Sequence, residues 1–198
     1  KTFANYWMHN GFVNIDNVKM SKSLGNFITV HDALKTIDGQ VLRFFFATQH
    51  YRKPINFTEK AVRDAETNLK YLKNTYEQPF TGEVDPADLQ GFVDKFIAAM
   101  DEDINAANGI TVVFELAKWI NSGHYNQDVK DALTKMLEVF GVVFVEEVLD
   151  ADIEALIAER QEARAKKDFA RADAIRDELA AQGIKLLDTK EGVRWTRD

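Results

Sequence analysis

The sequence contains no cysteine and only three prolines among its 198 residues. Without cysteine, the chain forms no disulfide and offers no thiolate to a metal ion. So few prolines, with 45% hydrophobic and 11% aromatic residues, indicate packed cores and not a disordered chain. No apolar run approaches the length of a membrane span, and no basic-then-apolar leader stands at the beginning. We therefore expect a folded chain without a membrane partner, and nothing in the composition contradicts a cytoplasmic location.

Excess positive charge is also missing. The chain has 25 Lys and Arg against 32 Asp and Glu, which gives a formal net charge of −7. A general nucleic-acid binder is normally basic overall, so this balance argues against one. It permits a specific binder whose basic side chains gather on one face.

No metal site is predicted in the chain. The carboxylate cluster at 101–105 (Asp-Glu-Asp-Ile-Asn) lacks the spacing and the glycine of a calcium loop. We interpret it as a solvated turn whose charges stand at the start of a helix. The four histidines are isolated from one another, at positions 9, 31, 50 and 124.

Apolar periodicity predicts a mainly α fold. Thr29 is expected to cap a short helix that Gly39 ends. The nearly unbroken apolar run 41–48 suits a buried helix or a buried strand, and its helical surroundings favour the helix. Longer helices with apolar stripes and short connections describe an antiparallel bundle. They cover residues 58–77, 88–100, 111–121 and 129–140.

The chain opens on an aromatic-rich stretch. Its first residue is lysine and not methionine, so we expect an excerpt cut inside a domain, with a processed terminus as the alternative. Residues 12–15 alternate like a short strand and are followed by turn residues. Trp7, Met8 and Phe12 are interpreted as core residues.

The last section predicts a small module of its own. Two charged helices, over 152–167 and 168–182, form a hairpin that Gly183 caps. Residues 184–188 and 193–196 are predicted to pair as strands. The tail is therefore expected to be an α-hairpin plus a two-stranded β-ribbon.

The stretch Lys19-Met20-Ser21-Lys22-Ser23 carries the clearest chemistry. Each lysine presents a compact ammonium on a flexible stem, which suits phosphate oxygens. The serine hydroxyls can bond a phosphate or the backbone of their own loop. Gly25, just beyond, permits a loop that folds over a ligand. A solvated basic turn is the alternative for any K-x-x-K sequence.

This string is the KMSKS motif of class I aminoacyl-tRNA synthetases, and the resemblance extends further. Residues 3–11 (Phe-Ala-Asn-Tyr-Trp-Met-His-Asn-Gly) precede it, Leu-Gly-Asn-Phe follows it, and the tail runs from Gly183-Ile184 to Trp195. Together these resemble cysteinyl-tRNA synthetases over essentially the whole chain. The resemblance implies the end of a catalytic domain with the KMSKS loop, stem-contact helices, a helical bundle of the anticodon-binding type and a C-terminal anticodon-recognition module. These parts would span 1–28, 29–78, 79–149 and 150–198.

Such a family implies ATP-dependent activation of cysteine and its transfer to tRNA(Cys), with Mg²⁺ accompanying ATP. Lys22 and Lys19 would be the catalytic lysines, and ATP would be bound by Lys19, Met20, Ser21, Lys22 and Ser23. A lysine aimed at the charge that builds on the departing pyrophosphate stabilises the transition state. The family's His-x-Gly-His motif and its cysteine-containing zinc site are absent from this sequence. We therefore expect zinc only in a full-length enzyme, and a catalytically silent chain here.

The resemblance also places anticodon contacts in the tail, at Arg164, Phe169, Asp173, Arg176 and Asp188. Splayed bases of a single-stranded loop can stack on an aromatic ring and bond Arg or Asp through their edges. Exposed helical ion pairs are the alternative for Arg164, Asp173 and Arg176. Trp195 is more simply a plug between ribbon and hairpin than a platform for a base.

Two other functions stay open. One is a freestanding tRNA- or protein-binding module built from the same parts. The other is a related ligase that joins cysteine to an amino-sugar and lacks the anticodon-binding tail. For the main hypothesis we expect a monomer in the cytoplasm.

Overall fold

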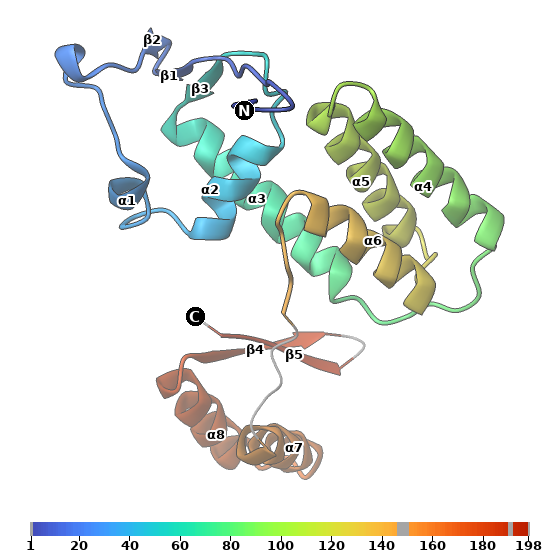
Figure 1. Ribbon diagram of the computed structural model, residues 1–198. Helices are drawn as coiled ribbons and strands as arrows, with labels where there is room; N and C mark the ends of the chain where they lie inside the picture. The colour runs from blue at the N-terminus through green and yellow to red at the C-terminus, as the bar shows by residue number, and fades with distance from the viewer. Residues whose placement is uncertain (1, 146–150, 190–191, 198) are drawn as a thin grey trace. The chain divides into compact units, whose positions relative to one another are not determined.

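The computed structural model describes residues 2–145, 151–189 and 192–197. It divides into two compact units, residues 1–144 and 145–198 (Figure 1). Helices dominate both units, as the apolar periodicity predicted. Within the described ranges, no helix combines the length and apolar character that crossing a membrane requires.

A small three-stranded sheet in the first unit carries the lysine motif. β1 (Val13–Ile15) lies in the middle, antiparallel to β2 (Val18–Lys19) and parallel to β3 (Ile55–Phe57). The turn between β1 and β2 has positive φ at both Asp16 (47°) and Asn17 (66°). Two successive left-handed residues are the geometry of a tight type I′ hairpin, which Asp and Asn tolerate. The predicted strand and turn are confirmed.

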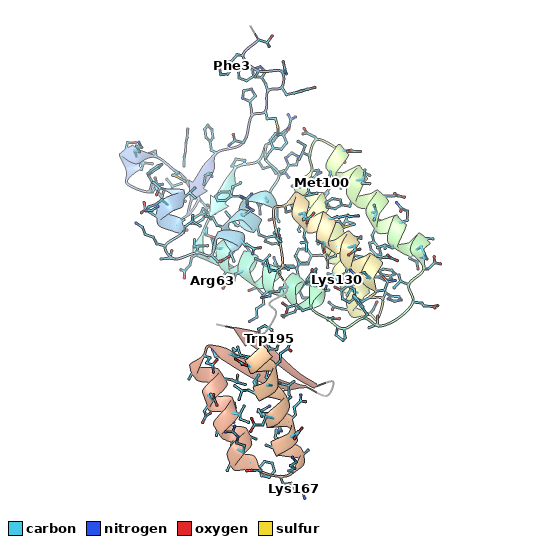
Figure 2. All side chains as sticks on the ribbon, turned by 60° about the horizontal axis from the view of Figure 1, so that its bottom comes forward. Phe3, Arg63, Met100, Lys130, Lys167 and Trp195 are labelled. Atoms are coloured by element: carbon cyan, nitrogen blue, oxygen red, sulfur yellow. The ribbon has the colours of Figure 1, made fainter. Side chains whose placement is uncertain are left out.

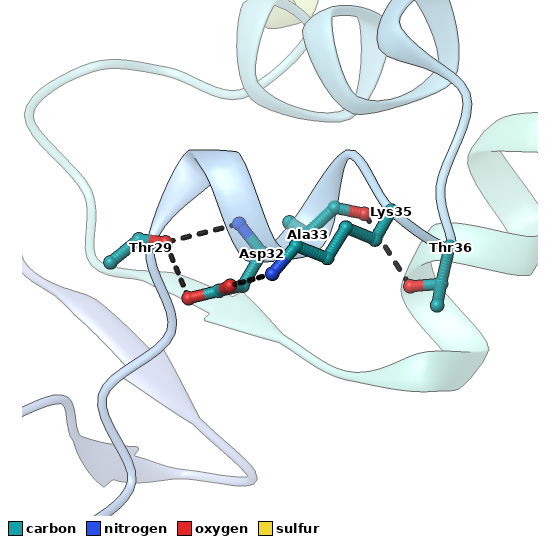
Figure 3. A network of polar contacts seen from close by, with 5 residues as sticks. All are labelled: Thr29, Asp32, Ala33, Lys35 and Thr36. Carbon is teal, nitrogen blue, oxygen red and sulfur yellow. Dashed lines mark hydrogen bonds and ion pairs between the residues drawn. The ribbon is translucent and has the colours of Figure 1, made fainter.

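A short helix follows the motif, as Figure 3 shows in detail. α1 (Val30–Ala33) begins after Thr29, whose hydroxyl accepts the backbone N–H of Asp32 at 3.0 Å and donates to its carboxylate at 2.7 Å. The Lys35 ammonium donates to the same carboxylate at 2.7 Å. This hydrogen bond, more than the one from Thr29, lowers the pKa of Asp32. The predicted cap at Thr29 is confirmed.

Gly39 does not end that helix, and the prediction was wrong at this point. It is the first residue of α2 (Gly39–Ala47), where the Asp38 carboxylate accepts the backbone N–H groups of Gln40 and Val41 at 2.8 and 3.2 Å. A side-chain acceptor in this position begins a helix. Glycine occurs at both ends of helices, so its presence alone does not say which end it marks.

α2 supplies the apolar centre of the first unit, so the run 41–48 forms a buried helix as predicted. α3 (Glu59–Tyr76), capped by Thr58 as predicted, packs along it. The buried side chains of α2 are Val41, Leu42, Phe44 and Phe45. Of these, Val41, Phe44 and Phe45 join a single core with side chains of α3 and of the helices that follow.

Three further helices complete this unit. α4 (Pro86–Asp101), α5 (Ala106–Asn121) and α6 (Gln127–Val139) pack side by side (Figure 1). A side-chain oxygen caps each of them, from Asp85, Asn105 and Asn126 in turn. α5 begins earlier than predicted because the Asn105 carboxamide provides the cap. The predicted helical bundle is confirmed.

Trp7, Met8 and Phe12 are exposed by 67%, 59% and 63%, so the prediction that they form core is wrong. Residues 2–12 form no helix or strand. Phe3, labelled in Figure 2, stacks on Trp7 with 5.8 Å between ring centroids, yet it is itself exposed by 92%. Apolar composition indicates that burial of a side chain is favourable, but it does not say which surface covers it.

The second unit pairs a helical hairpin with a ribbon, as predicted. α7 (Ala151–Ala165) and α8 (Phe169–Ala181) pack together, and β4 (Ile184–Thr189) pairs antiparallel with β5 (Gly192–Arg197). Gly183 follows α8 with φ at 78°, the left-handed conformation that commonly ends helices. The small core contains Ile153, Ile175, Leu179 and Ile184. Trp195 (Figure 2) packs against this core, which confirms its role as a plug.

The central helix of the bundle generates a first prediction. Leu116 on α5 is fully buried, so Leu116→Ala removes apolar contacts and leaves a cavity. We expect the free energy of unfolding of the first unit to fall by about 3 kcal/mol, measured by urea denaturation. Lys118→Ala, at an exposed position of the same helix, should change it by less than about 0.5 kcal/mol. Equal losses for the two variants would contradict the packing described.

Candidate functional site

The lysine motif forms a short loop at the end of the β1–β2 hairpin. Residues Lys22–Leu24 make one 3-10 turn, and the Ser21 hydroxyl caps it by accepting the backbone N–H of Leu24 at 3.2 Å. Gly25 then takes a φ of 70°, and its N–H donates to the Lys22 carbonyl at 3.2 Å. Glycine adopts this left-handed conformation without steric cost, so the chain reverses here.

Asn26 closes the neck of the loop. Its Oδ1 accepts the backbone N–H of Ser21 at 2.9 Å, and its Nδ2 donates to the Lys19 carbonyl at 3.3 Å. The hydroxyls of Ser21 and Ser23 are 3.0 Å apart and share a hydrogen bond. Sequence reasoning expected the serines to shape the loop but assigned Asn26 no role. In the sequence, Asn26 is marked only by its position after Gly25, and that position does not indicate that its carboxamide bonds across the loop.

Both lysine ammonium groups lie over aromatic rings at the surface. Lys19 Nζ is 3.9 Å from the ring centroid of Phe12, and Lys22 Nζ is 5.5 Å from that of Phe27. Cation–π contacts at exposed sites are worth about 0.5–1 kcal/mol, so either ammonium can leave its ring for a stronger partner. Among the ion pairs of the described residues, none involves Lys19 or Lys22. An anionic ligand therefore meets two available positive charges.

The hairpin that carries the loop is tied to β3. Asn17 and Asn56 exchange hydrogen bonds, with Asn17 N donating to Asn56 Oδ1 at 2.7 Å and Asn56 Nδ2 to Asn17 Oδ1 at 2.8 Å. Met20 N donates to the Val13 carbonyl at 3.0 Å. The Met20 side chain lines a small apolar hollow of about 40 Å³, together with residues of β1, β3, α1 and α2. Met20 is thus an anchor for the motif, and its neighbours on either side carry the charge.

Residues 101–104 are exposed and turn just before α5, as interpreted, and Asp103 in this turn also belongs to a polar network. Its carboxylate accepts the Tyr51 hydroxyl at 2.7 Å and Arg52 Nη2 at 2.9 Å, and its Oδ2 is 2.7 Å from Arg52 Nε. The hydrogen bond from Arg52 is the main cause that lowers the pKa of Asp103, and it raises the pKa of Arg52 in return. The partners are far apart in sequence, so periodicity gave no sign of them.

The segment between α2 and β3, which contains Tyr51 and Arg52, also contacts the residues just before β1. Gly11 N donates to the Tyr51 carbonyl at 2.7 Å, and a Cβ on Gly11 would lie 2.3 Å from the Lys53 carbonyl oxygen. Such a distance excludes any side chain at this position. The stretch between α2 and β3 is therefore bonded on one side to the residues just before β1 and on the other to the turn between α4 and α5.

The predicted RNA-reading residues lie on the helical hairpin of the second unit and its ribbon. Arg164 is in the last turn of α7 and Phe169 begins α8, where it is exposed by 62%. Asp173 and Arg176 form an exposed i,i+3 ion pair at 3.1 Å, which is the alternative expected for them. Asp188 lies in β4, and its side chain is outside the described residues. These positions stay predictions, since an ion pair can also exchange partners on binding.

Nothing in the described ranges gathers three or more His, Asp or Glu side chains around a point where a metal ion would sit. The cysteine-free sequence adds no thiolate. We therefore assign no residue of this chain to zinc or to Mg²⁺.

Three family models match successive parts of the chain. Residues 1–67 match the family described as tRNA synthetases class I (C) catalytic domain, 95–146 match the DALR domain, and 146–195 match the cysteinyl-tRNA ligase anticodon binding domain. The first match places the chain in the class I aminoacyl-tRNA synthetases. The relatives that match over the whole chain are cysteine–tRNA ligases, and the chain belongs to this family.

These relatives are longer than this chain. The cysteine–tRNA ligase of Streptococcus pneumoniae serotype 4 is 84% identical, that of Streptococcus mutans serotype c 80%, and that of Streptococcus agalactiae serotype III 73%, each over 100% of this chain. The chain spans 44% of the length of each of these curated relatives. A solved LeuRS–tRNA–LeuAMS complex from Agrobacterium radiobacter K84 aligns over 68% of this chain and 22% of that one, at 16% identity and a TM-score of 0.46, too distant to add to these matches.

The Asp103 network predicts a pH-dependent contribution to stability. Because its folded-state pKa is lowered, the contribution is present above the ordinary aspartate pKa of about 4 and is lost as the pH falls through the lowered value. Asp103→Asn tolerates the positive φ of 57° at this position, so it isolates the charge. We expect a lower thermal midpoint than the parent near neutral pH and a gap that closes below about pH 4.

Asp101→Asn provides the control, because no ion pair among the described residues uses that carboxylate. It should show no gap with this pH dependence in the same melting series. A deficit of Asp103→Asn that stays constant down to acid pH would mean that the carboxylate charge contributes nothing.

Proposed function

We propose that this chain is the part of a cysteine–tRNA ligase that supplies the KMSKS loop and the tRNA-binding region. The complete enzyme would activate cysteine with ATP and transfer it to tRNA(Cys). The observation that carries the proposal is the geometry of the lysine loop, in which two exposed lysines lie close together in the chain, Lys19 at the end of β2 and Lys22 on the turn that follows. The family membership supports the same reaction.

Within this proposal, the loop acts on the phosphates of ATP. The cysteine carboxylate attacks the α-phosphorus, pyrophosphate leaves, and negative charge grows on the departing oxygens. The Lys22 ammonium, at the exposed tip, would meet that charge and stabilise it more strongly in the transition state than in bound ATP. Lys19 would hold the phosphates from the base of the loop. Ser21 and Ser23 would keep the turn closed, while Met20 anchors it.

Mg²⁺ would arrive with ATP, and zinc would belong to a full-length enzyme. The described residues hold no ligand set for either, so the chemistry of this chain would come from its lysines, serines and backbone alone. We propose that the chain by itself is inactive, because the family's His-x-Gly-His motif does not occur in it.

The second unit would read the anticodon of tRNA(Cys). Phe169 offers an exposed ring on which an unstacked base can lie. Arg176 and Asp173 place a donor and an acceptor side by side on α8, and Arg164 and Asp188 would complete the contacts. The match to an anticodon binding domain over 146–195 favours this reading over the amino-sugar ligase and over a general protein-binding module. We further propose a monomer that works in the cytoplasm.

The catalytic role of Lys22 is testable in a chimera. A full-length relative would carry these 198 residues in place of its corresponding portion. Lys22→Ala should slow cysteine-dependent pyrophosphate exchange about a hundredfold, because charge stabilisation at the departing oxygens is lost. The affinity for tRNA should hardly change. Lys35→Ala removes a nearby lysine that already pairs with Asp32 and should leave the exchange rate as it was. Unchanged exchange in Lys22→Ala would contradict the proposal.

RNA reading is testable with the chain as it stands. We expect it to bind tRNA(Cys) more tightly than the same tRNA with a changed anticodon, because single-stranded bases are read through stacking and edge contacts. Binding should be weak and should fall steeply as salt is raised. Phe169→Ala should weaken binding of the native tRNA about tenfold and erase most of the preference. Equal affinity of the parent chain for both tRNAs in a fluorescence titration would contradict the anticodon assignment.

A further inference from the structure

We propose that Asn26 is the positioning residue of the lysine loop and sets the place of the Lys22 ammonium during ATP activation. The inference rests on the proposed function and adds to it a residue whose side chain need not touch ATP. The Asn26 carboxamide joins the two arms of the loop.

The hydrogen bonds of the loop fall into two groups. Those within the tip run from Leu24 N to Ser21 Oγ, from Gly25 N to the Lys22 carbonyl, and between the hydroxyls of Ser21 and Ser23. Those across the neck both use Asn26, which accepts from Ser21 N at 2.9 Å and donates to the Lys19 carbonyl at 3.3 Å. The tip can therefore keep its turn as a unit, but its attachment to the end of β2 depends on Asn26.

Burial follows the same division. Residues 22–25 are exposed, whereas Ser21 and Asn26 are half-buried. Backbone groups away from free solvent need partners, so loss of the carboxamide would leave the half-buried Ser21 N–H without one, whereas Lys19 is exposed and its carbonyl can bond to water. The easiest way for the Ser21 N–H to find a partner is a shift of the loop arms, which moves the tip.

The chemistry of the contact selects asparagine. A carboxamide offers one acceptor and one donor group on a short stem, which the two backbone partners require. Aspartate keeps the acceptor for Ser21 N–H but cannot donate to the Lys19 carbonyl when ionised, and it adds negative charge beside two lysines. Alanine offers neither group. Misplacement of a charged group by about 1 Å is costly in catalysis, so closure of the neck matters for rate.

The lysine side chains can move while the neck stays closed. Lys22 rests over Phe27 at 5.5 Å from the ring centroid, an orientation that a triphosphate can outcompete. A fixed neck limits the motion on ATP binding to the side chain and the exposed turn. The loop would then place Lys22 in the same position in each catalytic cycle, with little backbone ordering left to do.

The test uses the same full-length chimera and measures pyrophosphate exchange and tRNA affinity. Asn26→Ala should lower kcat of exchange about tenfold and leave the Kd for tRNA unchanged. If Asn26 acts through Lys22, the double variant Lys22→Ala/Asn26→Ala should be no slower than Lys22→Ala alone. Asn26→Asp, which keeps the acceptor, should lose at least as much activity as Asn26→Ala.

Asn126→Ala is the matched control. Like Asn26, Asn126 accepts a backbone N–H through its Oδ1, here from Val129 at 3.0 Å. Asn126, however, caps α6 and is not part of the loop. It should lower the melting temperature and leave kcat of exchange unchanged. This separates a general loss of stability from a loss of position.

The outcomes separate the positioning role from the proposed function. Normal exchange in Asn26→Ala or Asn26→Asp, or a double variant in which the two losses multiply, would overturn the positioning role while the proposed function stands. Normal exchange in Lys22→Ala would instead overturn the proposed function. A fall in the tRNA affinity of Asn26→Ala equal to its fall in kcat would indicate a structural role elsewhere and would also overturn the inference.

Discussion

Burial of the apolar faces of α2 is the constraint on which the first unit depends. On one side Phe45 and Phe46 meet Phe57 of β3, with ring centroids 5.6 and 6.4 Å apart. On the other side Val41 and Phe44 join the core shared with α3, α5 and α6. Full burial of one such side chain is worth about 1.5–3 kcal/mol, far more than any exposed ion pair in the unit. The sheet with its lysine loop and the helical bundle are therefore held by one helix.

Polar contacts contribute little to the stability of this arrangement but restrict its geometry. The Asp103–Arg52–Tyr51 network is exposed and joins residues from two turns. Exposed pairs of this kind are worth little in free energy, but several hydrogen bonds to one carboxylate restrict its geometry. Because the Tyr51 carbonyl also accepts the Gly11 N–H, the network connects the turn between α4 and α5 with the segment just before β1. Such contacts hold the segments on either side of them in register.

The helices were predictable because their signals are local. Thr58 caps α3 and the apolar stripe inside it has the helical period, so both boundary and buried face follow from neighbours in the chain. The same logic misassigned Gly39, because glycine was taken as the sign of a helix end, whereas Asp38 just before it is the N-cap of α2. It also misplaced Trp7, Met8 and Phe12, because hydrophobicity says that a residue gains from burial without naming a partner.

By itself, the sequence determined the mainly helical fold, the paired strands of the tail and the lysine motif with its resemblance to a tRNA ligase family. These depend on periodicity, caps and short strings of residues, which are all local in the chain. Only the tertiary structure decided that Asn26 bridges Ser21 and Lys19, that Asn56 holds Asn17, and that Asp103 meets Arg52. Hydrogen-bond partners of this kind are chosen by distance and direction in the folded chain, and unlike a helix cap they leave no recognisable pattern along the sequence.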